Sequence, residues 1–456
     1  MIQTELLRIA GFRGINVRAS KFLIPDSAAQ EIVNFVFSEE GVLTTIGGHT
    51  RWNATSLGPG KIQGGVWFRK TGAPPELIIA HQGKLYKGDP DFKTFTEIYT
   101  GLDTEALVEM LPYRDLLYIV NGVDRPLKWD GSNVTLMGLD APTTAPTATD
   151  SGVAGNLNGT YSWKVTFVSP THESHGSPAS NTLTVTNKQV NLSNIPVSSD
   201  PQVIKRRIYR TLAGGTVYKF VGEINDNTTT TFTDNVADSS LGVDIPVDKD
   251  PPPRGAFLEV FKNRLWMSGV AGQPNRLFFS EYFEPEAWPL HYYVDLPLAQ
   301  GDRITGLKTL GDVLVVYSRR QPVIVLGETP FDFVVRRTFA HVGPETHRSI
   351  IRIENTHLFF SQYGIYAFDG ATARLLSDDI SPIIRDIPQE TLKNVAAVYY
   401  EKKKQARFAV HLPQHRASTT DRFNNSELIY DLRTGSWSIS TKSIQHYIDS
   451  RDILAQ

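Results

Sequence analysis

The chain has 456 residues, of which 40% are hydrophobic and 10% aromatic, a composition that supports sizeable cores and excludes a wholly disordered protein. Basic and acidic residues nearly balance, 46 against 48, which argues against a tight duplex-DNA binder with a strongly basic surface. There is no cysteine, so disulfides, thiolate metal sites and cysteine nucleophiles are excluded. The first residues lack the basic flank and apolar core of a signal peptide, and no apolar run is long enough to span a bilayer. We therefore expect a soluble chain assembled in a cytoplasm.

The N-terminal part, 1–140, reads as a lead-in segment followed by the first strand-rich repeats. Ser27 to Asn34 is predicted to form a short helix capped near Asp26 or Ser27. Phe35 to Thr44 reads as strand, turn and strand. From 41 to 100, glycine-rich turns alternate with short apolar runs, and helical periodicity is almost absent.

A repeated unit is clearest between Asn263 and Trp288. Two aromatic-rich runs flank the turn sequence Gly-Val-Ala-Gly-Gln-Pro-Asn, which predicts an antiparallel hairpin. Shorter relatives recur, several ending in an aromatic residue followed by Asp and Gly, as at 129–131 and 368–370. They start about 40–50 residues apart, as expected for propeller blades. The predicted fold is an all-β propeller of about six blades, with seven or eight as alternatives. Six blades are countable, and the N-terminal strands are expected to complete a seventh or to join the sixth.

Residues 141–250 differ in character and are predicted to be an inserted β-sandwich. A Pro/Thr-rich stretch begins at Ala141, and Asp248 to Pro253 marks the return to blade-like sequence. Short strands are predicted at Tyr161–Val168, Thr182–Thr186, Val190–Leu192, Ile204–Arg210, Val217–Val221 and Thr230–Phe232. Trp163, with alternating Tyr161, Val165 and Phe167, is expected to supply the core of the sandwich.

The last part, 251–456, holds the remaining blades. One helix is expected around Pro388 to Val395. Ile444 to Leu454 is predicted to be a strand that closes the ring by pairing with an N-terminal strand.

Motifs for chemistry are sparse. His172-Glu173-Ser174-His175 places two histidines three residues apart in a predicted loop, unlike the zinc helix with two histidines four apart, so a solvated loop is favoured. Three acidic pairs could imitate the two carboxylates of a glycosidase, but turn or rim positions explain them more simply: Glu39-Glu40, Glu284 with Glu286, and Asp378-Asp379. The sequence therefore predicts no catalytic, cofactor-binding or metal-ligating residues, and no enzyme.

Four basic clusters are weighed as phosphate-binding patches: Lys205-Arg206-Arg207, Arg319-Arg320, Arg336-Arg337 and Lys402 to Lys404. The first alternates with apolar residues as on a half-buried strand. A solvated strand face or turn is the favoured interpretation.

Several stretches resemble the bacteriophage tail nozzle family, also called tail tubular protein B-like, of packaged-DNA stabilisation type. They are Val33–Leu43, Asn263–Trp266, Pro274–Ser280, Trp288, Asp302–Leu307 and Tyr430–Trp437. The insert is similar to fibronectin-III-like modules of such proteins at Arg206–Thr211, Phe232–Asp234 and Leu241–Gly242. The N-terminal thirty residues and the loop near 413–426 carry no family signal. Longer members of the family contain further domains, so the resemblance implies a reduced nozzle, or one whose receptor-contacting functions lie on other proteins.

This resemblance implies a non-enzymatic virion component, assembled in the host cytoplasm. It would form a ring, a homohexamer, between the portal and adaptor side and the distal tail proteins. Double-stranded DNA would pass through the lumen of the ring without sequence-specific contacts, and no cofactor or membrane insertion is implied. The alternative is a carbohydrate-binding or glycoside-cleaving propeller acting on host surface polysaccharide, because fold alone does not determine function.

Overall fold

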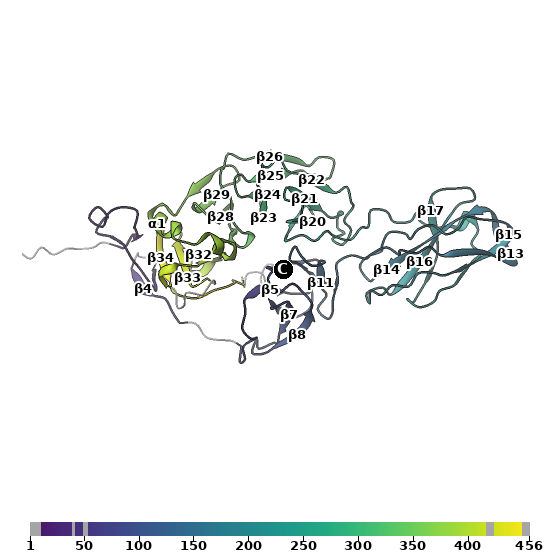
Figure 1. Ribbon diagram of the computed structural model, residues 1–456, viewed down its shortest axis with the longest axis horizontal. Coiled ribbons are helices and arrows are strands. Elements are labelled where there is room, and N and C mark those ends of the chain that lie inside the picture. Colours follow the sequence, from purple (N-terminus) through teal and green to yellow (C-terminus); the bar gives the residue numbers. More distant parts are fainter. Residues whose placement is uncertain (1–10, 39–41, 49–52, 416–423, 449–456) are drawn as a thin grey trace, which may run out of the picture.

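A computed structural model describes residues 11–38, 42–48, 53–415 and 424–448. Six four-stranded antiparallel sheets form the blades of a β-propeller, numbered 1 to 6 in chain order (Figure 1). The predicted all-β propeller with an inserted sandwich is confirmed. No helix in these ranges has the length and apolar character needed to cross a membrane.

The first three blades share one strand order, from the inner strand at the axis to the outer rim. Blade 1 comprises β5 (Ile62–Phe68), β6 (Glu76–His81), β7 (Lys84–Gly88) and β8 (Phe95–Thr100). Blade 2 comprises β9 (Glu109–Tyr113), β10 (Leu116–Val120), β11 (Leu127–Trp129) and β12 (Val134–Leu136). Blade 3 comprises β19 (Phe257–Phe261), β20 (Arg264–Ser268), β21 (Arg276–Phe279) and β22 (Tyr293–Asp295).

The remaining blades repeat this order. Blade 4 comprises β23 (Ile304–Leu310), β24 (Val313–Ser318), β25 (Val323–Leu326) and β26 (Val334–Arg337). Blade 5 comprises β27 (Ile351–Ile353), β28 (Thr356–Ser361), β29 (Gly364–Phe368) and β30 (Ala373–Leu375). Blade 6 comprises β31 (Ala396–Tyr400), β32 (Gln405–Val410), β33 (Ser426–Asp431) and β34 (Ser436–Ser440).

Both faces of a blade are buried against its neighbours, which explains the unbroken apolar runs. All five residues of β20 are buried. Leu265 and Met267 pack with Tyr118 of blade 2, whereas Trp266 lies in the cluster shared with blade 4. Because successive side chains of a strand point to opposite faces, one strand contributes to two cores. The predicted hairpin unit therefore contributes apolar side chains to the cores on both sides of its blade.

The recurring aromatic-Asp-Gly sequence forms a tight turn between the third and fourth strands. The carboxylate of Asp130 accepts the backbone N–H groups of Ser132 and Asn133, both at 2.7 Å. In blade 5, the carboxylate of Asp369 accepts the backbone N–H groups of Ala371 and Thr372 in the same way. Gly131 and Gly370 have φ of +95° and +98°, a region that favours glycine.

The insert leaves the ring after blade 2 and forms two three-stranded sheets (Figure 1, right). One sheet contains β13 (Thr147–Tyr161), β15 (Leu183–Ser193) and β18 (Phe232–Asp234). The other contains β14 (Trp163–Val168), β16 (Lys205–Thr211) and β17 (Tyr218–Ile224), and the 3-10 helix η1 spans Asp238–Ser240. Tyr161, Trp163 and Val165 lie in the sandwich core as predicted, but Phe167 packs instead with Leu139 and Val203 near the ring.

The N-terminal segment lies against blade 6. It contains β1 (Gly14–Ile15), β2 (Ala28–Ala29), β3 (Phe35–Phe37) and β4 (Leu43–Thr45). The helix predicted at Ser27–Asn34 is wrong, because β2 pairs with β1 and Val33 bridges to Ile439 of β34, so the backbone hydrogen-bonding groups are used between segments. These strands form two small two-stranded sheets beside the sixth blade, linked to it by that bridge, and do not form a seventh blade.

Helices are few in the described part of the chain. The segment Pro388 to Val395 contains the 3-10 helix η4 (Gln389–Asn394), and the α-helix α1 (Ser381–Arg385) precedes it. The other 3-10 helices are η2 (His347–Ser349), η3 (Asp378–Ile380), η5 (Glu401–Lys403) and η6 (Pro413–His415).

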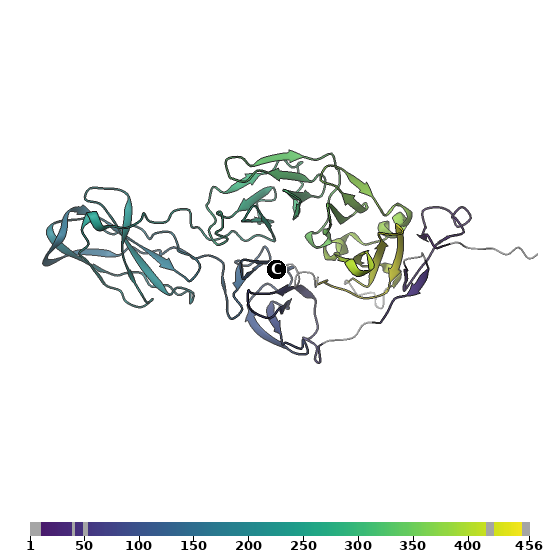
Figure 2. The same ribbon diagram turned by 180° about the vertical axis from the view of Figure 1, so that it is seen from behind.

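The predicted closing strand Ile444–Leu454 is wrong over 444–448, which is not in a strand; residues 449–454 lie outside the described residues. Blades 1 and 6 are each complete from their own four strands, so neither has a vacant strand position. Residues 441–448 instead run between blade 6 and blade 1. Figure 2 shows the same ring from behind, with this region at its centre.

Candidate functional site at the propeller axis

A cavity of about 360 Å³ lies at the axis, where the inner strands of the blades converge. Its polar lining comes from separate elements: Glu109 of β9, Lys308 of β23, His347 and Arg348 of η2, and His446 and Tyr447 of the C-terminal segment. These residues lie far apart in the sequence and form no motif. Sequence reasoning missed them all, since nothing in their spacing indicates that they meet.

Arg348 joins the inner strands of blades 1 and 2. Its Nη2 donates to the carbonyl oxygen of Gln63 and, at 3.0 Å, to that of Val108. Burial lowers the pKa of Arg348 to about 10, and the negative charge of Glu109 opposes this shift. The guanidinium therefore remains charged at neutral pH and acts as a cross-blade clamp.

Glu109 and His347 form a second contact across the axis. His347 Nε2 lies 3.3 Å from Glu109 Oε1, and its Nδ1 accepts the backbone N–H of Leu307. Burial alone would raise the pKa of Glu109, but His347, Arg348 and Lys308 outweigh it and lower the pKa to about 2. Glu109 is therefore a carboxylate at neutral pH.

The C-terminal segment fills much of the remaining space and connects blade 6 with blade 1. The side-chain oxygen of Gln445 accepts the backbone N–H of Ile62 at 2.6 Å, and His446 Nε2 donates to the carbonyl oxygen of Gly65 at 2.9 Å. A Cβ at Gly65 would lie 2.7 Å from Ile448 Cδ1, so glycine permits this close approach. Tyr447 donates its hydroxyl to the buried Glu427 of β33 at 2.7 Å.

Burial, aided by the nearby charge of Arg348, lowers the pKa of His446 to about 4. Its imidazole is therefore neutral at physiological pH. The other ring nitrogen, Nδ1, is buried without a hydrogen-bond partner among the described residues. The axial groups thus hold blades 1, 2 and 6 together, through main-chain contacts to blades 1 and 2 and through the Tyr447–Glu427 contact to blade 6.

The His172–His175 loop has a structural role at the base of the sandwich. His172 is buried, and Glu173 accepts hydrogen bonds from Arg207, Thr166 and Tyr209. His175 Nε2 accepts the backbone N–H of Lys249. The described residues contain no cluster of three or more histidine and carboxylate side chains suited to a metal ion.

Two of the acidic pairs serve structure, and the third, Glu39-Glu40, lies outside the described residues. Glu286 is buried and pairs with Lys128 at 2.5 Å, whereas Glu284 pairs with Lys249 at the surface. Asp378 pairs with Arg18, and Asp379 accepts a hydrogen bond from Asn16 at 3.2 Å.

The first basic cluster is fully paired within the sandwich. Lys205 pairs with Glu223, buried Arg206 with Asp226, and Arg207 with Glu173. Lys402 to Lys404 lie exposed at the turn between β31 and β32. Neither cluster forms a phosphate-binding pocket in the described structure, whereas Arg319 and Arg320 line a groove on blade 4.

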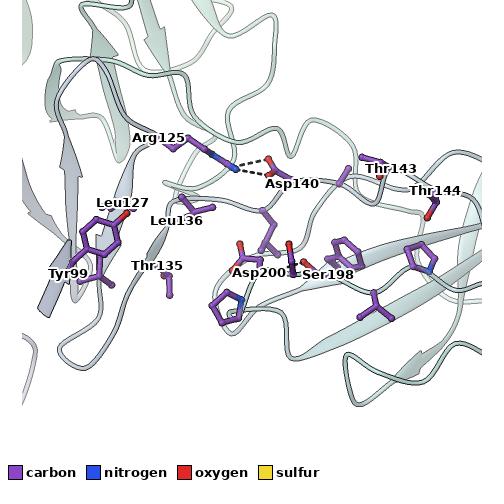
Figure 3. Close-up of a pocket in the computed structure, with 18 residues that line it drawn as sticks. Tyr99, Arg125, Leu127, Thr135, Leu136, Asp140, Thr143, Thr144, Ser198 and Asp200 are labelled. Atoms are coloured by element: carbon purple, nitrogen blue, oxygen red, sulfur yellow. Dashed lines mark hydrogen bonds and ion pairs between the residues drawn. The ribbon is translucent and has the colours of Figure 1, made fainter. Parts of the chain in front are cut away.

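A second cavity, of about 470 Å³, separates blade 2 from the sandwich (Figure 3). Arg125 makes a two-point ion pair with Asp140, at 2.7 and 2.9 Å. Beside it, Gln202 Nε2 contacts Asp200 and the carbonyl oxygens of Leu136 and Gly138. These polar groups mostly bind one another, so they connect blade 2 to the sandwich.

No protein-family model matches this chain, and no curated protein matches it. Among solved structures, it is similar to a streptogramin B lyase, with 12% identity and a TM-score of 0.32, covering 79% of this chain and 93% of the other. It is also similar to apo AztD from Citrobacter koseri, with 9% identity and a TM-score of 0.35, covering 86% and 88%. A chain of the mitotic checkpoint complex gives 9% identity and a TM-score of 0.38, covering 89% and 92%. At these values the likeness says nothing about what this chain does.

Proposed function

We propose that the protein is a non-enzymatic structural component of a bacteriophage tail. In this role, copies of the chain form a ring, a homohexamer, that retains packaged DNA and conducts it during ejection. The resemblance of the blade hairpins and of the insert to nozzle proteins motivates the proposal.

The observation that carries the assembly part is the exposure of large apolar side chains around β26, the outer strand of blade 4. Phe331, which precedes the strand in the sequence, is 100% exposed, and Phe339, which follows it, is 80% exposed. A second apolar tip, formed by Phe22 and Leu23, protrudes from the N-terminal segment. Large exposed apolar side chains are a feature of many protein–protein contact surfaces.

The contacts that the C-terminal segment makes at the axis support a structural role for each propeller. Residues 445–447 bind β5 and β33 there, so the protein's own C-terminal segment occupies part of the axis of a single propeller. In the proposed assembly, DNA passes through the lumen between protomers and not through a propeller.

The test is the size and shape of the purified full-length protein, measured by light scattering and electron microscopy. We expect rings, and we expect the double substitution Phe331→Asp and Phe339→Asp to reduce them to single chains. Val153→Asp, on the exposed surface of the sandwich, is the control and leaves the particle size unchanged. Strictly monomeric protein at all concentrations would contradict the proposal. Depolymerisation of host surface polysaccharide by the purified protein would favour the carbohydrate-active alternative.

A further inference from the structure

A groove of about 560 Å³ lies at the end of blade 4 where β24 turns into β25. Its lining includes Asp302, Arg319, Arg320, His341, Gln362 and Tyr363. The rest of the lining comes from the segments 297–301 and 318–323. We propose that this groove binds a phosphate-type oxyanion, either free phosphate or a phosphodiester group of a nucleic acid. The proposal goes beyond ring assembly and does not depend on it.

The turn that carries the two arginines is held in place by a buried carboxylate. Asp302 is 8% exposed, and its oxygens accept the backbone N–H groups of Arg303, Arg319 and Arg320 at 2.8, 3.2 and 3.3 Å. Asp302 therefore binds the main chain, and no ion pair joins it to a guanidinium group of another described residue. The turn is therefore fixed before any ligand arrives.

The two guanidinium groups differ in how they are held. Arg319 Nε lies 3.0 Å from Glu345 Oε2, which orients the group and leaves its terminal N–H groups for a ligand. Arg320 is exposed and makes no side-chain hydrogen bond or ion pair with another described residue. A planar guanidinium group matches the spacing of phosphate oxygens better than a lysine ammonium does.

The rest of the lining suits the same ligand. His341 is exposed, and Tyr363 is 66% exposed; both add hydrogen-bond donors beside the arginines. Gln362 contributes an amide. Asp302 is turned to the main chain and Glu345 to Arg319 Nε, so the charge that a ligand meets is that of Arg320 and of the terminal N–H groups of Arg319.

Arg336 on β26 provides a comparison within the same blade. It is exposed on the outer strand and does not line the groove. A charge placed outside the groove should contribute only to long-range attraction, which salt screens. Arg336→Ala therefore removes the same charge as Arg320→Ala without altering the site.

The experiment measures binding of inorganic phosphate by calorimetry and of a short fluorescent DNA duplex by anisotropy, with the full-length protein. We expect Arg320→Ala to weaken binding about tenfold, as for a lost charge-assisted hydrogen bond, and Arg336→Ala to leave it nearly unchanged. For the duplex, Arg320→Ala should also lower the slope of log affinity against log salt by about 1.

Binding of phosphate alone would support the site with a free anion as its ligand, and binding of the duplex, competed by phosphate, would support the phosphodiester source. If neither probe binds, or if both variants lose the same affinity, the proposal is overturned. Thermal unfolding of both variants checks that folding is unchanged, since both side chains are exposed. Particle size, measured in parallel, separates this outcome from a failure of ring assembly.

Discussion

His357, at the residue scale, is a histidine held neutral by its surroundings. It is fully buried in β28; its Nε2 donates to the carbonyl oxygen of Thr309 at 3.1 Å, and its Nδ1 lies 2.8 Å from the hydroxyl of Tyr317. Burial raises the pKa of Tyr317, so that hydroxyl stays protonated and donates to Nδ1. In the neutral imidazole, Nδ1 accepts from Tyr317 and Nε2 donates to Thr309, and burial disfavours the addition of a second ring proton.

This arrangement predicts a loss of stability in mild acid. Burial lowers the pKa of His357 to about 3, from an ordinary value of 6.5. The contribution of the neutral ring is complete above about pH 6.5 and declines as the pH falls toward 3, because only the unfolded chain takes up the proton. At about 1.4 kcal/mol per pH unit, the free energy of unfolding should fall by about 2 kcal/mol between pH 6.5 and 5.

Urea unfolding over this range checks the prediction. His357→Gln keeps a donor and an acceptor but cannot titrate, so its pH profile should be flatter than that of the unsubstituted chain. His291→Gln, with a side chain that is 66% exposed, should leave the profile unchanged. Equal slopes in all three proteins would show that His357 does not carry the effect.

At the scale of elements, the C-terminal segment, residues 441–448, connects blade 6 with blade 1 through hydrogen bonds to both. Tyr447 binds blade 6 through its hydroxyl, which donates to Glu427. Glu427 is fully buried; its other oxygen has no partner among the described residues, and Arg407 is 3.7 Å from the first. Removing the hydroxyl would leave the carboxylate poorly satisfied.

We therefore expect Tyr447→Phe to lower the free energy of unfolding by about 1–3 kcal/mol. Amide hydrogen exchange should also accelerate in β5, because Gln445 and His446 hydrogen-bond to that strand. Tyr282→Phe serves as the control, since Tyr282 is 48% exposed. Unchanged exchange in β5 would mean that the segment is held independently of Tyr447.

The elements that sequence reasoning predicted well are those in which the pattern is local. The run around Trp266 is aromatic because both faces of β20 are buried, and the turn residues on either side bound it. The strand predicted at Ile204–Arg210 corresponds to β16 at Lys205–Thr211. In such cases the order of apolar and polar residues along the strand directly reflects which side chains are buried, so the strand can be predicted from the sequence.

Prediction failed where pairing partners are distant. The sequence of β13 contains Asp150, Gly152, Gly155 and Gly159, which are poor strand formers, and its ladder with β15 has three register shifts. The residues of the axis meet only after all the blades have formed. Neither feature leaves a local signature, so the candidate site at the axis could not be predicted from the sequence.

On the scale of the whole molecule, a buried ion pair fixes the sandwich to the ring. Lys128 of blade 2 and Glu286 of blade 3 are 5% and 3% exposed and lie 2.5 Å apart. Thr171, at the base of the sandwich, donates to the other oxygen of Glu286 at 2.7 Å. One carboxylate therefore contacts two blades and the insert.

Glu286→Gln should destabilise the protein by about 3–5 kcal/mol, because it leaves Lys128 buried without a counter-charge. Solution X-ray scattering should also show a wider range of sandwich orientations. Glu284→Gln, two residues earlier, removes an exposed ion pair with Lys249 and should cost less than about 1 kcal/mol. Similar losses in the two variants would contradict the role of burial.

The axial segment also has a consequence for the order of folding during synthesis. Gln445 meets Ile62 across 383 positions of chain, so this contact cannot form until all six blades have left the ribosome. The inner edge of β5 in blade 1 therefore lacks its hydrogen-bond partners from the C-terminal segment for nearly the entire period of translation. A nascent chain stalled before residue 441 should for this reason bind chaperones more than a chain stalled after the segment has emerged.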